Sequence, residues 1–251
     1  MFQKAEENQI VTANPAKSLV IDKRGKVERN PLTKEQQKEF FEAAKGTVYE
    51  NAFWVQTLTG LRSGELRALN WKTDIDFEKR ELKITKTLCY DKRPGDDHRN
   101  FYITPPKTDS SIRKVKFDKR CETILKRQII KKRQLDFSHP VTVDLAQDLL
   151  FVSSLNTPIT PYGYYTAIKR VVEKINKKRG PGEEEFPDIS SHIFRHTYAT
   201  RCFEAGVEPK TVQKQLGHAT LEMTMNTYTH VLEDQLDVDI DKFSRYTDSI
   251  L

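Results

Sequence analysis

The stretch "SHIFRHTYAT", residues 191–200, places polar side chains at helical spacing. Residues three and four positions apart share one face of a helix, so His192, Arg195 and His196 are expected to form a polar stripe. The neighbouring face is more apolar and carries Phe194, Thr197, Tyr198 and Cys202. Two interpretations are open at this point: a solvated face beside a core face, or a site that holds an anion such as a phosphate.

The composition limits the classes of protein to which this chain can belong. A length of 251 residues fits one large domain or two small ones. No apolar run approaches the roughly 20 residues of a membrane span, and the first residues lack a secretory pattern, so we expect no membrane partner. The three scattered cysteines, Cys89, Cys121 and Cys202, suit the reducing cytoplasm and indicate neither a disulfide framework nor a zinc site.

The charge distribution is more informative than the net charge of +6, which permits nucleic-acid binding without requiring it. The stretches "KRQIIKKRQ" (126–134) and "IKRVVEKINKKRG" (168–180) are dense in Lys and Arg. The last 21 residues, from Val231, carry six acids against Lys242 and Arg245, a net charge of −4. Each basic run, taken alone, fits a solvated helix face as well as it fits a surface that binds a polyanion. A polyanion is therefore expected to meet the middle of the chain rather than its end.

The order of predicted elements is helices, a small sheet, then helices, which indicates an α+β fold. Thr33 with Gln36 forms a capping-box pattern at the start of a helix. A buried helix is predicted over 49–60, and another starts just after Arg62. Period-2 patterns over 81–88, 101–104 and 112–117 predict a small three-stranded antiparallel sheet. Helices return at Asp118, at Thr160 with a stop at Gly180, over 191–206, and as two short segments on either side of 217–219.

Four more phrases carry residues that could complete a site with His192 and Arg195. They are "TGLRSGEL" (59–66) with Arg62, "PPKTDSS" (105–111) with Lys107, "QLGHAT" (215–220) with His218, and "NTYTHV" (226–231) with Tyr228. Each alone has an ordinary explanation: an arginine paired with Glu65, a solvated turn lysine, or a core tyrosine.

Taken together and in this order, the phrases resemble the tyrosine recombinase family, also called the phage integrase family, over about residues 33–230. The sequences of these phrases are most similar to those of integrases of conjugative transposons, and the phrase around Lys107 matches less tightly than the others. The resemblance implies a mainly helical catalytic domain that cleaves and rejoins DNA site-specifically through a 3′-phosphotyrosine intermediate. It would serve the integration and excision of a mobile element.

The resemblance also assigns roles to these residues. Tyr228 would be the nucleophile, and His192 would accept its proton. Arg62, Arg195 and His218 would donate to the nonbridging phosphate oxygens. Lys107 would protonate the leaving oxygen, with Lys86 and Lys114 as alternatives because the strand register is uncertain. Glu65 would brace Arg62, and His196 would support the fold.

No cofactor is expected. The sequence has no Walker loop, no carboxylate cluster near the site phrases and no zinc-type Cys/His spacing. Fixed cationic donors would then stabilise the transition state in place of a metal, and the phosphotyrosine bond would make ATP unnecessary.

The family's organisation implies four segments. Residues 1–16 would be the remnant of the last helix of a core-binding domain, 17–32 a linker, 33–230 the catalytic domain and 231–251 a tail. Leu236, Val238 and Ile240 have strand spacing in this tail, and Phe243, Tyr246 and Ile250 have helical spacing. The tail is expected to dock on a neighbouring protomer or on its own domain.

The expected partners are double-stranded DNA, further copies of the chain in a tetrameric synapse, and an accessory DNA-bending protein. Two alternatives share the fold. A type IB topoisomerase would relax supercoils by the same chemistry, and a non-catalytic DNA-binding module would have lost members of the constellation. Because every member is present here, the module is disfavoured.

Overall fold

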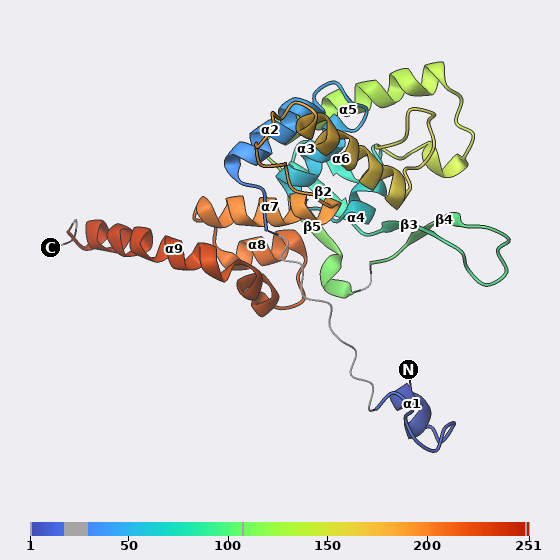
Figure 1. Ribbon diagram of the computed structural model, residues 1–251, viewed down its shortest axis with the longest axis horizontal. Helices are drawn as coiled ribbons and strands as arrows, with labels where there is room; N and C mark the ends of the chain where they lie inside the picture. The colour runs from blue at the N-terminus through green and yellow to red at the C-terminus, as the bar shows by residue number, and fades with distance from the viewer. Residues whose placement is uncertain (1, 18–29, 107, 249, 251) are drawn as a thin grey trace.

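The computed structural model describes residues 2–17, 30–106, 108–248 and 250, with the backbone alone at 3, 109 and 226–239 (Figure 1). The helices are α1 (Phe2–Glu7), α2 (Lys34–Ala44), α3 (Glu50–Thr59), α4 (Ser63–Arg67), α5 (Lys119–Ser138), α6 (Pro161–Asn176), α7 (Ser191–Glu204), α8 (Pro209–Leu216) and α9 (Leu221–Asp248). The strands are β1 (Ile75–Asp76), β2 (Glu81–Ile84), β3 (Thr87–Asp91), β4 (Asn100–Thr104) and β5 (Arg113–Lys116), and short 3-10 turns cover Asp109–Ser111 and Asp144–Ala146. The mainly helical α+β architecture predicted from the sequence is confirmed.

The small three-stranded antiparallel sheet is also confirmed, but its membership differs from the prediction. Its order is β1-β2-β5, with Leu82 opposite Val115. The predicted strand 81–88 is divided: its second half becomes β3, which pairs with β4 in a separate ribbon that extends away from the body in Figure 1. The third strand of the sheet is β1, which is too short to produce a period-2 pattern.

An aromatic core fixes the position of α7 against α2, α3 and α6. The Phe194 ring centroid lies 5.3 Å from that of Phe40 and 5.6 Å from that of Phe53, and Tyr164 packs against Phe53. All four side chains are buried. Because Phe194 points into this core, the rotation of α7 is fixed and its neighbour Arg195 is directed toward the ends of α3 and α8.

Three of the predicted helix starts are confirmed by their side-chain caps. Thr33 and Gln36 form the reciprocal capping box at the start of α2, at 3.0 and 3.1 Å. The Asp118 carboxylate accepts from the Cys121 amide at 2.7 Å, and the Thr160 hydroxyl from the Gly163 amide at 2.9 Å. The stop predicted at Gly180 is wrong, because α6 ends at Asn176.

The tail differs most from the sequence prediction. A short helix followed by a strand over 236–240 was expected, but α9 runs without interruption from Leu221 to Asp248. A brief alternation of apolar and acidic residues is weaker than the propagation of a helix that has already started. The predicted boundary at 230 therefore falls inside one helix.

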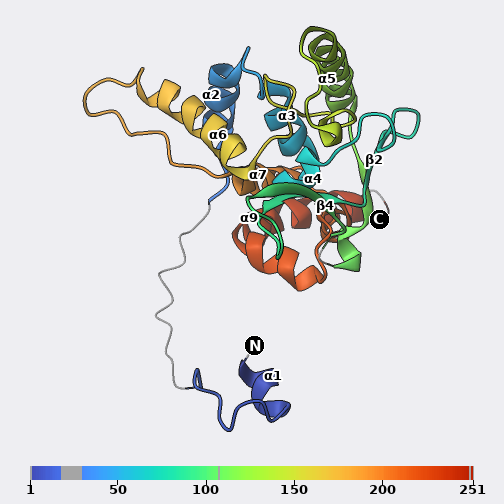
Figure 2. The same cartoon turned by 90° about the vertical axis from the view of Figure 1, so that its right-hand side faces the viewer.

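At the other end of the chain, α1 lies apart from the body in both views (Figures 1 and 2). Most of the predicted linker over 17–32 lies outside the described residues. The division of the chain into four segments remains a prediction. Within the described ranges, no helix combines the length and the apolar character that crossing a membrane requires.

Candidate active site

Two glycines close the helices that frame the site. Gly60 ends α3 with φ +66°, and Gly217 ends α8 with φ +67°. This left-handed conformation favours glycine. A Cβ on Gly60 would lie 2.5 Å from a Tyr198 ring carbon, and one on Gly217 would lie 2.8 Å from Cδ of Arg113. The glycines of "TGLR" and "QLGH" thus permit both the turn and the close packing around it.

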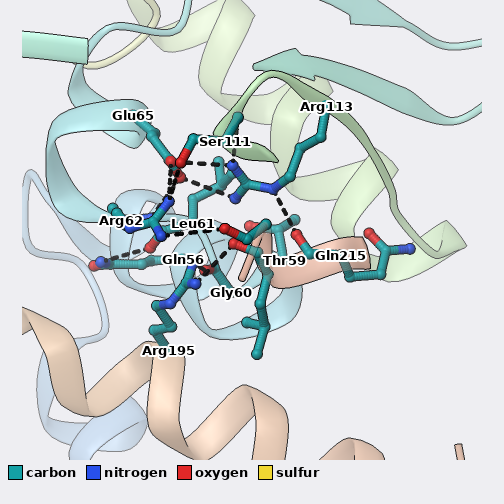
Figure 3. Close-up of polar contacts among 12 residues, drawn as sticks. Gln56, Thr59, Gly60, Leu61, Arg62, Glu65, Ser111, Arg113, Arg195 and Gln215 are labelled. Atoms are coloured by element: carbon teal, nitrogen blue, oxygen red, sulfur yellow. Dashed lines mark hydrogen bonds and ion pairs between the residues drawn. The ribbon is translucent and has the colours of Figure 1, made fainter. Parts of the chain in front are cut away.

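Arg195 joins these two helix ends. Its Nη1 donates to the Gly60 carbonyl at 2.8 Å and its Nη2 to the Leu216 carbonyl at 2.7 Å (Figure 3). Carbonyls at helix C-termini lack intrahelical partners and carry the negative end of the helix dipole, so a guanidinium group stabilises them. Arg195 is buried, and its contacts bring the phrase that contains Arg62 next to the phrase that contains His218.

Arg62 lies at the start of α4 and is held by Glu65. Its Nη1 donates to Oε1 of Glu65 at 2.8 Å, and its backbone amide donates to Oε2 at 2.9 Å. Nη2 makes a longer contact of 3.4 Å to the Gly217 carbonyl. The Arg62 side chain remains 35% exposed. The expected pairing with Glu65 is therefore present, and it leaves part of the guanidinium facing solvent.

Arg113, on β5, is a site residue that the sequence analysis missed. Its Nη1 and Nη2 each donate to an oxygen of Glu65 at 3.0 Å, and its Nε donates to the Gln215 carbonyl at 2.7 Å (Figure 3). The signal was available: Val115 and Phe117 face inward, so strand alternation also turns Arg113 inward. An inward-facing arginine requires a buried partner.

The local electrostatics favour a bound anion. Burial would raise the pKa of the Glu65 carboxyl, but the hydrogen bonds and charges of Arg113, and then those of Arg62, together hold it below its ordinary value. Glu65 is therefore ionised at neutral pH. Together with Arg195, these four residues carry two more positive than negative charges, because arginine stays protonated in proteins.

His218 follows Gly217 and is held by α9. Its Nδ1 lies 2.8 Å from the hydroxyl of Thr224, which is fully buried. Burial, followed by the charges of Arg195 and Arg62, lowers the pKa of the imidazole to about 4. The ring is thus neutral at pH 7. If its Nδ1 accepts from the threonine hydroxyl, the other ring nitrogen carries the proton and can act as a donor.

The structure places His192, His196 and Tyr228 only in part. His192 is exposed in the first turn of α7, one turn before Arg195, and His196 is half-buried. The charge of His196 contributes to lowering the pKa of His218, so these two rings are neighbours. Tyr228 lies on α9, which packs against α7 and α8, and its side chain is outside the described residues.

Tyr198, by contrast, is a poor candidate for the nucleophile. Its ring packs against Gly60, and burial raises the pKa of its phenol far above the ordinary value.

Lys107 itself lies outside the described residues, but other residues of the turn that contains it contact Arg62. The hydroxyl of Thr108 lies 3.0 Å from that of Ser111, which accepts from Arg62 Nη1 at 3.4 Å. The alternatives are engaged elsewhere. The Lys86 ammonium lies 2.8 Å from Asp74, and that of Lys114 lies 3.5 Å from Glu81.

The arrangement therefore brings together Arg62, Arg195 and His218 from three separate phrases. The buried Arg195 and Arg113 hold helix ends, the Arg62 side chain is partly exposed, and the neutral imidazole of His218 is held through its Nδ1. Such preorganised donors suit an oxyanion or a phosphate, for which arginine is the preferred ligand. The catalytic roles remain predictions for all six residues: Arg62, Lys107, His192, Arg195, His218 and Tyr228.

Comparisons with known proteins identify the family of this chain. Residues 30–235 match the model of the phage integrase family. A tyrosine recombinase XerC-like protein of Caldanaerobacter subterraneus is 31% identical over 93% of this chain and 60% of its own length. The transposase from transposon Tn916 of Enterococcus faecalis is also 31% identical, over 87% of this chain and 52% of its own length. The chain thus spans about half to three-fifths of these relatives.

A solved structure of a transposon integrase also matches this chain. The Tn1549 transposon integrase in complex with a circular intermediate DNA superposes with a TM-score of 0.77 at 28% identity. The match covers 96% of this chain and 75% of that one. The family model spans the stretches that carry Arg62, Arg195 and His218. The chain belongs to the phage integrase family of tyrosine recombinases.

Proposed function

We propose that this chain is the DNA-cleaving and rejoining part of a site-specific recombinase that integrates and excises a mobile element. The observation that carries the proposal is the convergence of Arg62, Arg195 and His218 at the ends of α3 and α8. These residues come from three distant phrases, and their shared feature is a set of donors aimed at an anion.

In the proposed reaction, the Tyr228 oxygen attacks the scissile phosphorus and the bond from phosphorus to the 5′-oxygen breaks. The phenol has an ordinary pKa of about 10, so its proton must be removed during attack. His192 accepts that proton. Attack by a 5′-hydroxyl on the phosphotyrosine reverses the step and rejoins the DNA, with Tyr228 recovering its proton.

The charge on the phosphorane is met by fixed donors. Arg62 and Arg195 each direct N–H groups toward nonbridging oxygens, and neutral His218 adds one more. Removing one such donor typically raises the barrier by about 2.7–4 kcal/mol. Lys107 gives a proton to the leaving 5′-oxygen. Since arginine charge replaces metal charge and the phosphotyrosine conserves the bond energy, the proposed reaction needs neither a metal ion nor ATP.

The proposed partners follow from this chemistry. Double-stranded DNA that carries the recombination sites is the substrate, and four copies of the protein in a synapse exchange the strands. An accessory DNA-bending protein would assist them in the bacterial cytoplasm. Relatives solved with DNA, such as the Tn1549 integrase, support the choice of substrate.

The test is covalent capture on nicked DNA. A duplex with a nick next to the scissile phosphate loses a short fragment after cleavage, so the protein–DNA adduct accumulates. We expect an adduct that forms in EDTA without ATP and maps to Tyr228. Tyr228→Phe, which removes one oxygen, should bind DNA and form none. An adduct that maps to Tyr198 or Tyr246 would show that the nucleophile is assigned wrongly.

A further inference from the structure

Arg113 is a buried arginine that the proposed reaction does not use. Its side chain is 6% exposed. Removing a guanidinium from water costs several kcal/mol unless its N–H groups are satisfied. Here they are: Arg113 donates to both oxygens of Glu65, to the Ser111 carbonyl at 3.0 Å and to the Gln215 carbonyl at 2.7 Å. This one side chain connects three segments that carry site residues.

The first connection runs through Glu65 to Arg62. Oε1 of Glu65 accepts from Nη1 of both arginines, at 2.8 Å for Arg62 and 3.0 Å for Arg113. Oε2 accepts from the Arg62 amide at 2.9 Å and from Nη2 of Arg113 at 3.0 Å. Arg113 grips the carboxylate with both N–H branches, whereas the Arg62 side chain contacts one oxygen. The fork of Arg113 therefore fixes the plane of the carboxylate on which Arg62 is oriented.

The second connection holds the turn that presents His218. Arg113 donates to the Gln215 carbonyl, and its Cδ lies so close to Gly217 that a Cβ there would approach to 2.8 Å. The side chain of Gln215 in turn accepts from the Lys116 amide on the same strand at 3.0 Å. The end of α8 is thus attached to β5. His218 lies three residues after Gln215, directly beyond this attached end.

The third connection reaches the turn over 105–111. Arg113 donates to the Ser111 carbonyl, while the Ser111 hydroxyl accepts from Arg62. Ser111, the last residue of this turn, is therefore held by the same two arginines. A salt bridge that served stability alone would need none of these shared contacts, because one carboxylate and one arginine would be sufficient.

We propose that Arg113 is a positioning residue that orients Arg62 through Glu65 and holds the turn that presents His218. The proposal rests on the proposed function, because positioning has a meaning only if Arg62 and His218 act on a phosphate. Arg113 touches no reacting atom. Its loss should lower the rate of cleavage at saturating DNA while leaving DNA affinity nearly unchanged.

The test compares four variants in single-turnover cleavage of nicked DNA at saturating concentration. They are Arg113→Ala, Arg113→Lys, Arg62→Ala and the double variant Arg62→Ala/Arg113→Ala. DNA affinity and the melting temperature are measured separately. Arg179→Ala is the control, because it removes another Arg–Glu pair, in which Arg179 lies just after the end of α6 and 2.8 Å from Glu39 on α2.

We expect Arg113→Ala to slow cleavage about 100-fold, the size of effect that follows from misplacing a reacting group by about 1 Å. Arg113→Lys keeps the charge but has no fork, so it should remain folded and still be at least about 10-fold slow. The double variant should be slower than Arg62→Ala by clearly less than about 100-fold, because the route through Arg62 is already absent and only the hold on the turn before His218 remains to be lost.

Three outcomes would overturn the proposal. They are cleavage by Arg113→Lys at the wild-type rate, losses that multiply in the double variant, and a loss of activity in Arg113→Ala no greater than that in Arg179→Ala. If Arg113→Ala fails to fold, the cleavage rate of Arg113→Lys tests the proposal in its place. A wild-type chain that forms no adduct at Tyr228 rejects the proposed function and this proposal with it. Wild-type cleavage with unaffected Arg113 variants rejects the positioning role alone.

Discussion

The Nδ1 atom of His218 lies 2.8 Å from the Oγ1 atom of Thr224, so the first turn of α9 holds the ring from behind. A neutral imidazole has one donor and one acceptor nitrogen. If the threonine hydroxyl donates to Nδ1, the proton of His218 is on Nε2, where it points away from Thr224. This contact makes the donor role proposed for His218 depend on a residue of the nucleophile's own helix.

Thr224→Val should therefore impair cleavage without removing any group that touches DNA. We expect a loss of about 10-fold, smaller than the 10²- to 10³-fold loss typical of deleting a transition-state donor, which His218→Ala should show. Nitrogen NMR of the imidazole should report a mixture of tautomers in place of one. Cleavage at the wild-type rate together with an unchanged tautomer would remove Thr224 from this role.

The depressed pKa of His218 predicts how stability varies with pH. The pKa is about 4 in the folded chain and about 6.5 when the imidazole is free, mainly because burial disfavours the charged ring. Between these values the unfolded state binds more protons, so the stability that His218 contributes falls as the pH is lowered from about 6.5 to about 4. Urea unfolding of the wild type should show this slope.

His218→Gln is the control for this prediction, because it has no titrating ring. The difference in unfolding free energy between the wild type and His218→Gln should increase with pH over that window and be level above it. A difference that does not vary with pH, or one that varies in the opposite direction, would contradict a neutral buried His218.

Gly217 offers a matched pair of glycine substitutions. Gly217→Ala places a Cβ 2.8 Å from Arg113 and 3.0 Å from the Ser110 carbonyl, whereas Gly46→Ala meets nothing within 4 Å. Both positions have positive φ, at +67° and +78°. Both variants should lose about 1 kcal/mol or more from backbone strain. Only Gly217→Ala should also slow cleavage, which a single-turnover assay with both proteins would measure.

Much of the site could be predicted from the sequence because its members belong to phrases that keep the same local context. Arg62, Arg195 and His218 each follow or face a glycine-ended helix, and these local features are readable. For Arg113, strand alternation indicates only that the side chain faces inward, because nothing local identifies its partner, Glu65, which is 48 positions away.

In the fold, too, features that depend on nearby residues are predicted, and features that depend on distant segments are not. Helix starts were predicted well, since a cap such as Thr33 with Gln36 involves residues three positions apart. The strand pairing was not, because it depends on which distant segments meet. The segment over 81–88 looks continuous in sequence, yet its two halves belong to different sheets. The continuous α9 is not evident from the alternation over 236–240, because this pattern carries no information about the helix that precedes it and continues through it.

The assignment of the proton donor can be tested by chemistry at the leaving group. Lys107→Ala should severely slow cleavage of ordinary DNA. A 5′-bridging phosphorothioate leaves as a thiolate, which needs no proton, so this substrate should restore most of the rate. Lys86→Ala and Lys114→Ala are the controls, because their ammonium groups pair with Asp74 and Glu81. Rescue of either control, with none for Lys107→Ala, would move the role to that lysine.

The last turns of α9 present apolar side chains to solvent. Ile240, Phe243 and Tyr246 are each more than half exposed, and they recur every three residues, so they lie toward one side of the helix. In Figure 1 this end of α9 extends beyond the body of the protein. The net charge of −4 from Val231 onward disfavours contact with DNA. We therefore predict that this apolar face docks on a neighbouring protomer in the synapse, in preference to its own domain.

Deleting residues 236–251 should then abolish DNA-dependent oligomers and change the rate of cleavage, because the same helix carries Tyr228 and its docking would help to place the nucleophile. Thr224 and the described core lie before the deletion, so the remaining domain should stay folded, as circular dichroism would show. The charge-only variant Asp241→Asn/Asp248→Asn is the control, since it keeps the apolar face. Sedimentation on DNA measures the assembly. A truncated chain that still assembles like the full one would exclude this end of α9 as the connector between protomers.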